Sequence, residues 1–257
     1  MDFLYDKTFK CLYCKQKFTS KNVRSRHVKI KKVDEDGCSH YQGEANPYLY
    51  KVASCPHCGF VFTQNFLVDS LNRNIIKENY IDKLSHVDNH VNQRTIEEAI
   101  KLYKLALASA QISNQTYEIK AGLSIITAWL YRLKEDENEH KFLHMARANY
   151  IKAYENEILK GEEIEVIKKI FHISIFLEDD KTATKWMNEI YKYKNSQLTM
   201  SSKEILNELR EKIASWNETL KGDKKIIFKS WTILNISLTD TDIISIINAQ
   251  INLWEEP

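Results

Sequence analysis

The chain has 257 residues, of which 43% are hydrophobic and 28% charged, with six glycines, three prolines and a formal net charge of +2. This composition excludes a disordered or collagen-like chain and favours a folded, helix-rich protein, because charged helix formers are common and helix breakers scarce. No apolar run reaches the roughly 18 residues that a membrane span needs, and the N-terminus lacks the apolar core of a signal peptide. We therefore expect a cytoplasmic protein with no membrane association.

Two Cys-x-x-Cys pairs lie in the first 64 residues, Cys11 with Cys14 and Cys55 with Cys58. Four thiolates are the number that a tetrahedral structural zinc ion takes, and they leave no position open for a substrate. Gly59 follows the second pair, where a sharp turn around a metal needs a flexible backbone. The two pairs together predict one structural Zn²⁺ ion. Iron remains open as the metal, and free or redox-active thiols remain the alternative.

Residues 1–64 are predicted to form a zinc-ribbon-like or rubredoxin-like antiparallel β module. Strand-like runs occur at residues 15–19, 27–31, 48–53 and 60–62, and Asp34–Gly37 has the composition of a turn. Sixty residues bury little apolar surface, so we expect metal binding to supply much of the folding free energy, on the order of 10 kcal/mol.

The segment Lys15–Lys32 contains eight Lys and Arg residues and no acidic residue. On a β hairpin such a face could lie along phosphate groups, and the residues expected to contact nucleic acid or a partner are Arg24, Arg26, Lys29 and Lys31. The alternative is a solvated face, balanced by the acidic residues that follow and by the net negative charge of the rest of the chain.

Polar residues also gather in the insert between the two cysteine pairs. They are Asp34, Asp36, Tyr41, Asn46 and Tyr48. These side chains either line a recognition pocket or form turns, for which Asp and Asn are well suited. We expect Cys38, in the same insert, to be a small buried residue, since four other thiolates already complete a zinc site.

From residue 65 the apolar residues repeat with helical spacing. Helices are expected over residues 69–88, 95–112, 117–134, 137–159, 163–177, 182–194 and 202–220, with Thr95 and Glu98 forming a capping box. Residues 129–136 and 175–180 each lead through an acidic turn into an amphipathic helix. This internal repeat favours a tetratricopeptide-like helical domain over residues 65–221, with an irregular bundle as the alternative. The sequence of the extension, 222–257, predicts no definite structure.

Two His-x-x-x-His pairs occur in the helical region, His86 with His90 and His140 with His144. Neither has the glutamate beside the first histidine that a metalloprotease helix needs, so surface histidines are expected. The sequence contains no glycine-rich phosphate loop and no serine nucleophile motif, and we assign no catalytic residue.

The chain resembles the bacterial family known as domain of unknown function 2225. The resemblance rests on Leu4-Tyr5-Asp6-Lys7, Cys11 and Cys14 with Phe18, Val23-Arg24, Asp34 and Asp36, Tyr41, Asn46-Pro47-Tyr48-Leu49-Tyr50, Cys55-Pro56-His57-Cys58-Gly59, Ala121-Gly122-Leu123 and Ala128-Trp129-Leu130-Tyr131-Arg132. It departs at Gly37, where the family favours an aromatic residue, and beyond residue 222. The resemblance implies a metal module followed by helical repeats, and it implies no activity.

The sequence thus predicts an α+β protein, mostly α, with a metal-stapled β module ahead of an antiparallel helical array. Concave helical surfaces commonly hold peptides or helices, so we expect a non-catalytic metal-binding adaptor for a protein or peptide partner. A nucleic-acid-binding regulator that uses the basic hairpin Lys15–Lys32 is the alternative, and a redox or metal-dependent enzyme is the third reading. The sequence predicts no oligomeric state.

Overall fold

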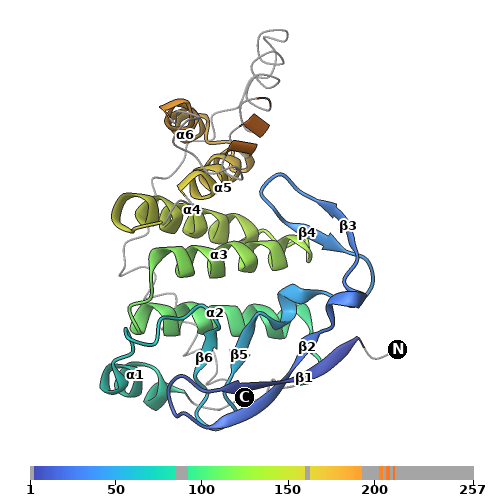
Figure 1. Cartoon of the computed structure of the whole chain (residues 1–257), viewed down its shortest axis with the longest axis vertical. Coiled ribbons are helices and arrows are strands. Elements are labelled where there is room, and N and C mark those ends of the chain that lie inside the picture. Colours follow the sequence, from blue (N-terminus) through green and yellow to red (C-terminus); the bar gives the residue numbers. More distant parts are fainter. Residues whose placement is uncertain are drawn as a thin grey trace. The chain divides into compact units, whose positions relative to one another are not determined.

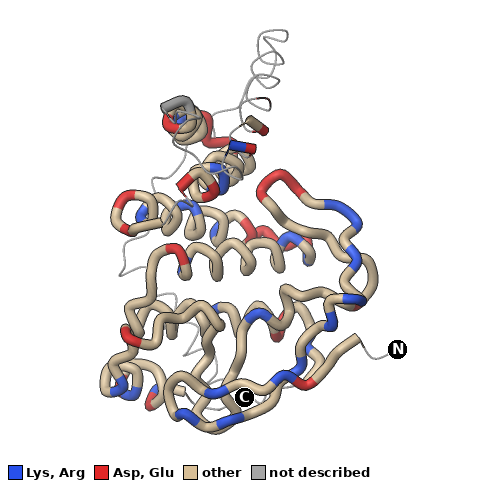
Figure 2. Tube along the Cα trace, in the orientation of Figure 1, with Lys and Arg blue, Asp and Glu red and all other residues tan. Residues whose placement is uncertain are grey.

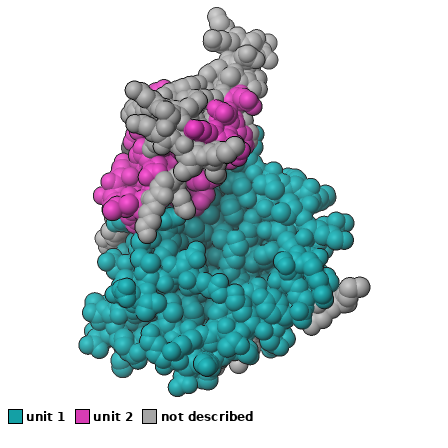
Figure 3. Space-filling model, viewed as in Figure 1, with its two compact units in different colours: residues 1–146, 238–257 teal, residues 147–237 magenta. Residues whose placement is uncertain are grey.

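The computed structural model describes residues 3–84, 92–159 and 163–192, with residues 203, 204, 207, 208 and 211. The chain divides into two compact units, residues 1–146 with 238–257 and residues 147–237 (Figure 3). The predicted boundary at residues 64 and 65 lies inside the first unit and remains a prediction. His86, His90 and the extension 222–257 lie outside the described residues, as does most of the helix expected over 202–220.

Three antiparallel hairpins form the β part of the first unit (Figure 1). They are β1 (Leu4–Lys10) with β2 (Lys17–Val23), β3 (Ile30–Val33) with β4 (Ser39–Tyr41), and β5 (Val52–Ser54) with β6 (Val61–Thr63). The register of β1 and β2 runs from Leu4 opposite Val23 to Lys10 opposite Lys17. One cysteine pair lies in the β1–β2 turn and the other in the β5–β6 turn, so both hairpins end at the same site.

Two 3₁₀ turns lie between these hairpins, η1 (Ser25–His27) and η2 (Pro47–Tyr50). The strand expected at 48–53 is therefore wrong over its first half. Pro47 fixes a backbone angle suited to a helical first turn, and the side chain of Asn46 accepts a hydrogen bond from the amide of Tyr48 at 2.9 Å. Local capping outweighs the β propensity of Tyr48 and Tyr50.

Helix α1 (Arg73–Asn79) begins at its cap Asn72 and is followed by the short turn η3 (Ile81–Lys83). The single helix expected over 69–88 is thus shorter at both ends. It stops at Tyr80, whose buried hydroxyl donates to the backbone oxygen of Gly59 at 3.3 Å. The tertiary contact with the second cysteine turn ends the helix where the periodic pattern alone would continue.

Helices α2 (Ile96–Ile112), α3 (Tyr117–Arg132) and α4 (Asn138–Asn156) follow. The capping box at the start of α2 is confirmed, with Thr95 and Glu98 each bonding the other's backbone amide. Helix α2 packs against α3 and against the β5–β6 hairpin (Figure 1), and its Leu102 and Tyr103 are fully buried between them. This contact forms the core of the first unit.

The second unit contains α5 (Glu163–Phe176) and α6 (Asp180–Lys192), which pack against each other. The turn that joins them resembles the α3–α4 turn. Glu178 (φ 54°) and Glu135 (φ 56°) both have a left-handed backbone. In each turn the amide of the residue that follows the glutamate donates to the backbone oxygen five residues before it, at 2.9 Å after Glu178 and at 3.1 Å after Glu135. These are the two acidic turns in which the sequence showed a repeat. Overall, small strand pairs precede a helical array, which confirms the predicted fold class.

No helix among the described residues is both long and apolar enough to cross a membrane.

Candidate metal centre

The four predicted ligand cysteines meet in space, although about forty residues separate the two pairs. Their sulfur atoms all lie within 4.8 Å of one another. The Sγ atoms of Cys11 and Cys58 are 3.7 Å apart, and those of Cys14 and Cys55 are 3.6 Å apart. These separations are too long for a disulfide, and all four thiols are free.

The backbone holds the two pairs in equivalent turns. In the first turn the amide of Lys15 donates to the oxygen of Cys11 at 3.1 Å, and the amide of Cys11 donates to the oxygen of Gln16 at 2.9 Å. The second turn repeats both bonds: the amide of Gly59 donates to the backbone oxygen of Cys55 at 2.8 Å, and the amide of Cys55 donates to the backbone oxygen of the residue five positions later at 3.1 Å. Lys15 (φ 66°) and Gly59 (φ 72°) occupy the same left-handed position.

The sulfur geometry fits a metal ion. Zinc–sulfur bonds of about 2.3 Å in a tetrahedron place neighbouring sulfurs about 3.8 Å apart. The two shortest separations, 3.6 Å and 3.7 Å, are close to that value. Each turn supplies two soft donors, and the four cysteines lie close enough to hold a metal ion.

Helix α1 and the residue after it support the outside of both turns. Arg73 donates through Nη1 to the oxygen of Tyr13 at 2.7 Å, and its guanidinium lies 5.0 Å from the centre of that ring. Tyr13 in turn contacts Phe60, which is fully buried, with ring centroids 6.0 Å apart. Together with the bond from Tyr80 to Gly59, these contacts place an aromatic shell around the thiols.

Without a metal, the packed thiols cannot all ionise together. A hydrogen bond from Cys58 lowers the pKa of Cys11 to about 5, while burial raises the pKa of Cys55 to about 12. The pKa of Cys58 is also raised, because its proton bridges to Cys11 and the site is buried. A metal ion that binds all four as thiolates must therefore displace protons, so its affinity rises with pH.

A second buried cluster joins the β3–β4 hairpin to α3, and we call Asp34, Asp36, Arg132 and Glu139 the Arg132 cluster. The Arg132 guanidinium donates to Asp34 Oδ2 at 2.9 Å and to Asp36 Oδ1 and Oδ2 at 3.0 Å and 2.7 Å. Its Nε donates to Glu139 Oε1 at 2.6 Å. The side chain of Asp36 is only 1% exposed. One guanidinium thus contacts three carboxylates, and Asp34, whose side chain is 22% exposed, is also paired with Lys32 and His40.

Neighbouring groups complete the hydrogen bonds of this cluster. Trp129 Nε1 donates to Asp36 Oδ2 at 2.9 Å, and the amide of Cys38 donates to Asp36 Oδ1 at 3.2 Å. Burial alone would raise the pKa of Asp34, but hydrogen bonds from His40, Lys32 and Arg132 lower it to about 2. Burial opposes the charge of Arg132, yet the carboxylates of Asp36 and Glu139 raise its pKa above its usual range.

A family model described as an uncharacterized protein conserved in bacteria, DUF2225, matches residues 4–215. The chain belongs to the DUF2225 family. No curated protein and no solved structure was found to match it. Among the motifs on which the resemblance rests, Asp34 and Asp36 come from the hairpin and Trp129 and Arg132 from α3, and the structure brings them into one cluster. The residues on which the resemblance rests therefore include a packing contact as well as the cysteines.

The other residues of the predicted recognition pocket lie beside this cluster. The ring of Tyr48 contacts those of Tyr41 and Trp129, with centroids 5.2 Å and 5.3 Å apart, and its hydroxyl accepts the amide of Ser39 at 2.8 Å. Asn46 instead faces its own 3₁₀ turn. The hydroxyl of Tyr48 and the side chain of Asn46 bond within the chain, so the geometry supports a structural reading of these residues, and the role of the set as a recognition pocket remains a prediction.

Cys38 is fully buried, which confirms its expected burial. Its thiol lies within 4.8 Å of ligand atoms of Asp34 and His40, a combination that could hold a metal. Arg132 Nη1 and His40 Nε2 already contact the same oxygen of Asp34, at 2.9 Å and 2.7 Å. The positively charged guanidinium thus lies beside Asp34 where a metal ion would lie and supplies the positive charge that the metal would bring. We therefore assign no metal to this position.

Sequence reasoning missed Arg94, which is 4% exposed and lies at the N-terminal end of α2. Its guanidinium donates to the backbone oxygens of Leu49 and Val52 at 3.0 Å and 2.8 Å and to Ser20 Oγ at 3.2 Å. Burial lowers its pKa to about 10. Arg94 joins the first hairpin, η2 and β5 to α2. No periodicity reveals such a residue, because Ser20, Leu49 and Val52 are distant from it in sequence.

The four basic residues predicted to contact nucleic acid or a partner lie in the segment that runs from the end of β2 into β3. Arg24 and Arg26 flank Ser25 at η1, Lys29 precedes β3, and Lys31 is an exposed residue of β3. Figure 2 shows Lys and Arg along the chain from β2 to β3, with Asp and Glu gathered at the tip of the β3–β4 hairpin. The structure therefore separates the basic face from the acidic one.

Proposed function

We propose that this DUF2225 protein is a non-catalytic adaptor in which one structural zinc ion holds the N-terminal hairpins and the helical array binds a protein or peptide. The observation that carries the proposal is the closed set of four sulfurs. Protein side chains supply all four donors of a tetrahedron, and the sulfurs of Cys11 and Cys55 belong to fully buried residues. A structural metal site is closed in this way, whereas a catalytic site keeps a position for substrate.

The sulfur contacts favour a metal over a redox pair. The two shortest separations each join one turn to the other, Cys11 to Cys58 and Cys14 to Cys55. A Cys-x-x-Cys redox motif would instead bring the two cysteines of one turn together. Zinc suits four thiolates in a tetrahedron, and bound to them it would fix the two turns together without redox chemistry.

The repeated turns of the helical array support the adaptor reading. The α3–α4 and α5–α6 connections share a left-handed glutamate followed by an aspartate that caps the next helix: Asp136 accepts the amide of Asn138 at 2.9 Å, and Asp179 accepts that of Thr182 at 3.0 Å. Helix pairs with a repeated turn are typical of tetratricopeptide-like arrays, whose surfaces bind peptides or helices.

Two measurements test this proposal. Elemental analysis of purified protein is expected to find one zinc ion per chain, lost in Cys58→Ser but retained in the control Cys38→Ala, which alters a buried cysteine outside the site. Tagged protein recovered from native lysate after nuclease treatment is expected to retain a discrete protein partner through a salt wash. Protein without metal, with a melting temperature that Cys58→Ser leaves unchanged, would contradict the structural role of the site.

A further inference from the structure

The structure divides the basic residues between Lys15 and Lys32 into paired and unpaired groups. Lys21 forms an ion pair with Asp6 at 2.9 Å, and Lys32 forms one with Asp34 at 3.1 Å. Lys15 donates to a backbone oxygen in the first cysteine turn. In the segment that runs from the end of β2 into β3, four basic residues have no described carboxylate within 4.0 Å: Arg24, Arg26, Lys29 and Lys31. Their charges are available to an external anion.

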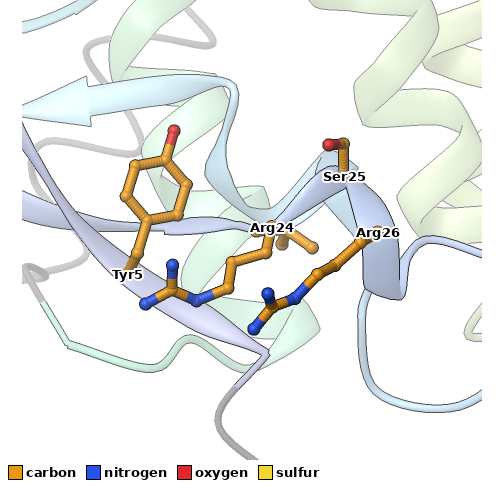
Figure 4. Close-up of a pocket in the computed structure, with 5 residues that line it drawn as sticks. Tyr5, Arg24, Ser25 and Arg26 are labelled. Carbon is orange, nitrogen blue, oxygen red and sulfur yellow. The ribbon is translucent and has the colours of Figure 1, made fainter.

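Arg24 and Arg26 direct their guanidinium groups to the same side, while Ser25 between them points away (Figure 4). The Arg24 guanidinium carbon lies 5.5 Å from the centre of the Tyr5 ring, which supports it. These residues, with Val23, line an open hollow of about 350 Å³. Two planar donors beside an aromatic ring suit a phosphate group, because each guanidinium can donate two parallel hydrogen bonds.

A second open hollow, of about 490 Å³, shares Arg26 with the first. Its lining adds His27 and Lys29, together with one carboxylate at its edge, Glu44. Arg26 Nε donates to His27 Nε2 at 3.2 Å, which fixes the direction of the guanidinium. The hollows adjoin at Arg26, so the cations form a strip instead of converging on one enclosed point.

We propose that this strip, defined as Tyr5, Arg24, Arg26, Lys29 and Lys31, binds the phosphodiester backbone of a single-stranded nucleic acid. A row of cations, three of which line the two adjoining open hollows, fits a chain of phosphates better than a compact anion, which needs donors converging from several sides. The Tyr5 ring, next to Arg24, offers a base a surface on which to stack, and stacking requires bases that are not paired in a duplex. The strip is built from the β hairpins and η1, so it does not depend on the protein partner proposed above.

The number of cations sets the expected salt dependence. Four phosphate contacts to a single strand give a slope of about −2.8 for the logarithm of the association constant against the logarithm of salt concentration. Raising the salt from about 50 mM to about 200 mM should therefore weaken binding about 50-fold. Removing two of the contacts should reduce the slope by about 1.4.

The test uses the full chain with its metal and a fluorescent oligothymidine of about 12 nucleotides, a length within the range of single-strand binding sites. Fluorescence anisotropy should show binding that Arg24→Gln/Arg26→Gln weakens by about 10-fold or more at low salt. Lys29→Gln/Lys31→Gln, changed on a different element, should have an effect of the same sign. Metal content and melting temperature should match those of the unaltered chain in both variants.

A matched control removes the same charge from the other end of the first hairpin. Lys10 and Lys17 are exposed and lie opposite each other, five residues along β1 from Tyr5, which is about 17 Å. Lys10→Gln/Lys17→Gln should leave the affinity within about twofold of the original, because it removes charge without touching the strip.

Several results would overturn the proposal. An equal loss in the control variant would show a general charge effect, and unchanged binding in both strip variants would place the site elsewhere. Equal competition by a duplex of the same length would remove the role of stacking. Equal competition by a polyglutamate peptide would make an acidic protein the better ligand. None of these outcomes affects the metal measurement or the capture of a protein partner, so the two proposals fail separately.

Discussion

The candidate metal centre and the Arg132 cluster each bring together residues that are distant in the sequence, with different chemistry. The candidate metal centre gathers the soft donors of Cys11, Cys14, Cys55 and Cys58 within 4.8 Å of one another. The Arg132 cluster joins the β3–β4 hairpin to α3 through one guanidinium and three carboxylates. The first can be predicted from residue spacing, because each half is a short motif. The second cannot be predicted from spacing, because the sequence does not show which distant arginine pairs with a given aspartate.

The two regions also differ in how their free energy is distributed. A structural metal contributes on the order of 10 kcal/mol of folding free energy through four bonds, so its loss removes one large contribution to stability. A buried ion cluster contributes little net stability, since desolvation offsets much of the attraction, but the loss of one partner leaves charges uncompensated. The following predictions test this difference, from the largest expected effect to the smallest.

Removing the metal should have the largest effect. A strong chelator, or Cys11→Ser, is expected to destabilise the β1–β2 and β5–β6 hairpins by an amount on the order of 10 kcal/mol. Hydrogen exchange should show lost protection in β1 and β2, while α3, held through its packing on α2, keeps most of its protection. Retention of protection in β1 and β2 without metal would show that apolar packing alone holds the first hairpin.

Replacing the central cation of the second region should have the next largest effect. Arg132→Met is expected to lower the free energy of unfolding by about 3–5 kcal/mol, because it removes the ion-pair partner of Asp36 and Glu139 and one of the three partners of Asp34. Denaturant unfolding measures the change. Arg147→Met, which removes the partner of Asp179 (2.9 Å) in a simple pair of the second unit, serves as a comparison and should cost less. An Arg132→Met effect below about 1 kcal/mol would contradict the cluster's structural role.

The pH dependence of stability should come partly from Asp34. Its pKa in the folded chain is about 2, below the ordinary value of 3.8, so the unfolded state binds more protons in this range. The stability that this shift contributes is present above pH 3.8 and is lost as the pH falls through about 2. Denaturant midpoints measured across this window should fall less steeply for Asp34→Asn than for the original chain. If the midpoints of the two proteins fell equally steeply with pH, the result would contradict the assignment of this pH dependence to Asp34.

The smallest expected effect concerns the left-handed residue in each cysteine turn, and one substitution in each turn tests it. Lys15 and Gly59 share a left-handed backbone, which glycine adopts freely and lysine does not. Lys15→Gly should stabilise the metal-bound protein by about 0.5–1 kcal/mol, and Gly59→Ala should destabilise it by about 1 kcal/mol or more. Thermal unfolding with metal present measures both. Changes of the same sign would show that the turns are not equivalent.

Local signals account for what the sequence predicted correctly. The spacing of the cysteines, the capping box at Thr95 and Glu98 and the apolar pattern of α3 are each contained within a few residues or one helix. The errors arise where a distant contact decides. Helix α1 ends at Tyr80 because its hydroxyl bonds Gly59, and Arg94 and Arg132 find partners about forty and ninety-five residues away.

Gly37 illustrates the same limit at a single position. The family resemblance favours an aromatic residue there, and this chain has a glycine with a φ of 91°. A β-carbon at Gly37 would lie 3.8 Å from the indole ring of Trp129, an ordinary contact distance. The structure thus gives a reason for an aromatic residue, which could extend over Trp129, although the backbone of this chain would have to leave its left-handed conformation first.

The insert between the two cysteine turns has a further consequence, for cooperativity. A metal bound to the four thiols would restrain this segment of about forty residues, and Arg132 restrains it through Asp34 and Asp36, so each must overcome the entropy of closing a loop when it acts alone. Once Asp34 and Asp36 dock on α3, the chain between the cysteine pairs is already folded back, and the first pair reaches the second at a raised effective concentration. Metal binding and hairpin docking are then linked equilibria, each favouring the other by the same factor. A substitution at Arg132, far from any sulfur, will therefore lower the affinity for the metal.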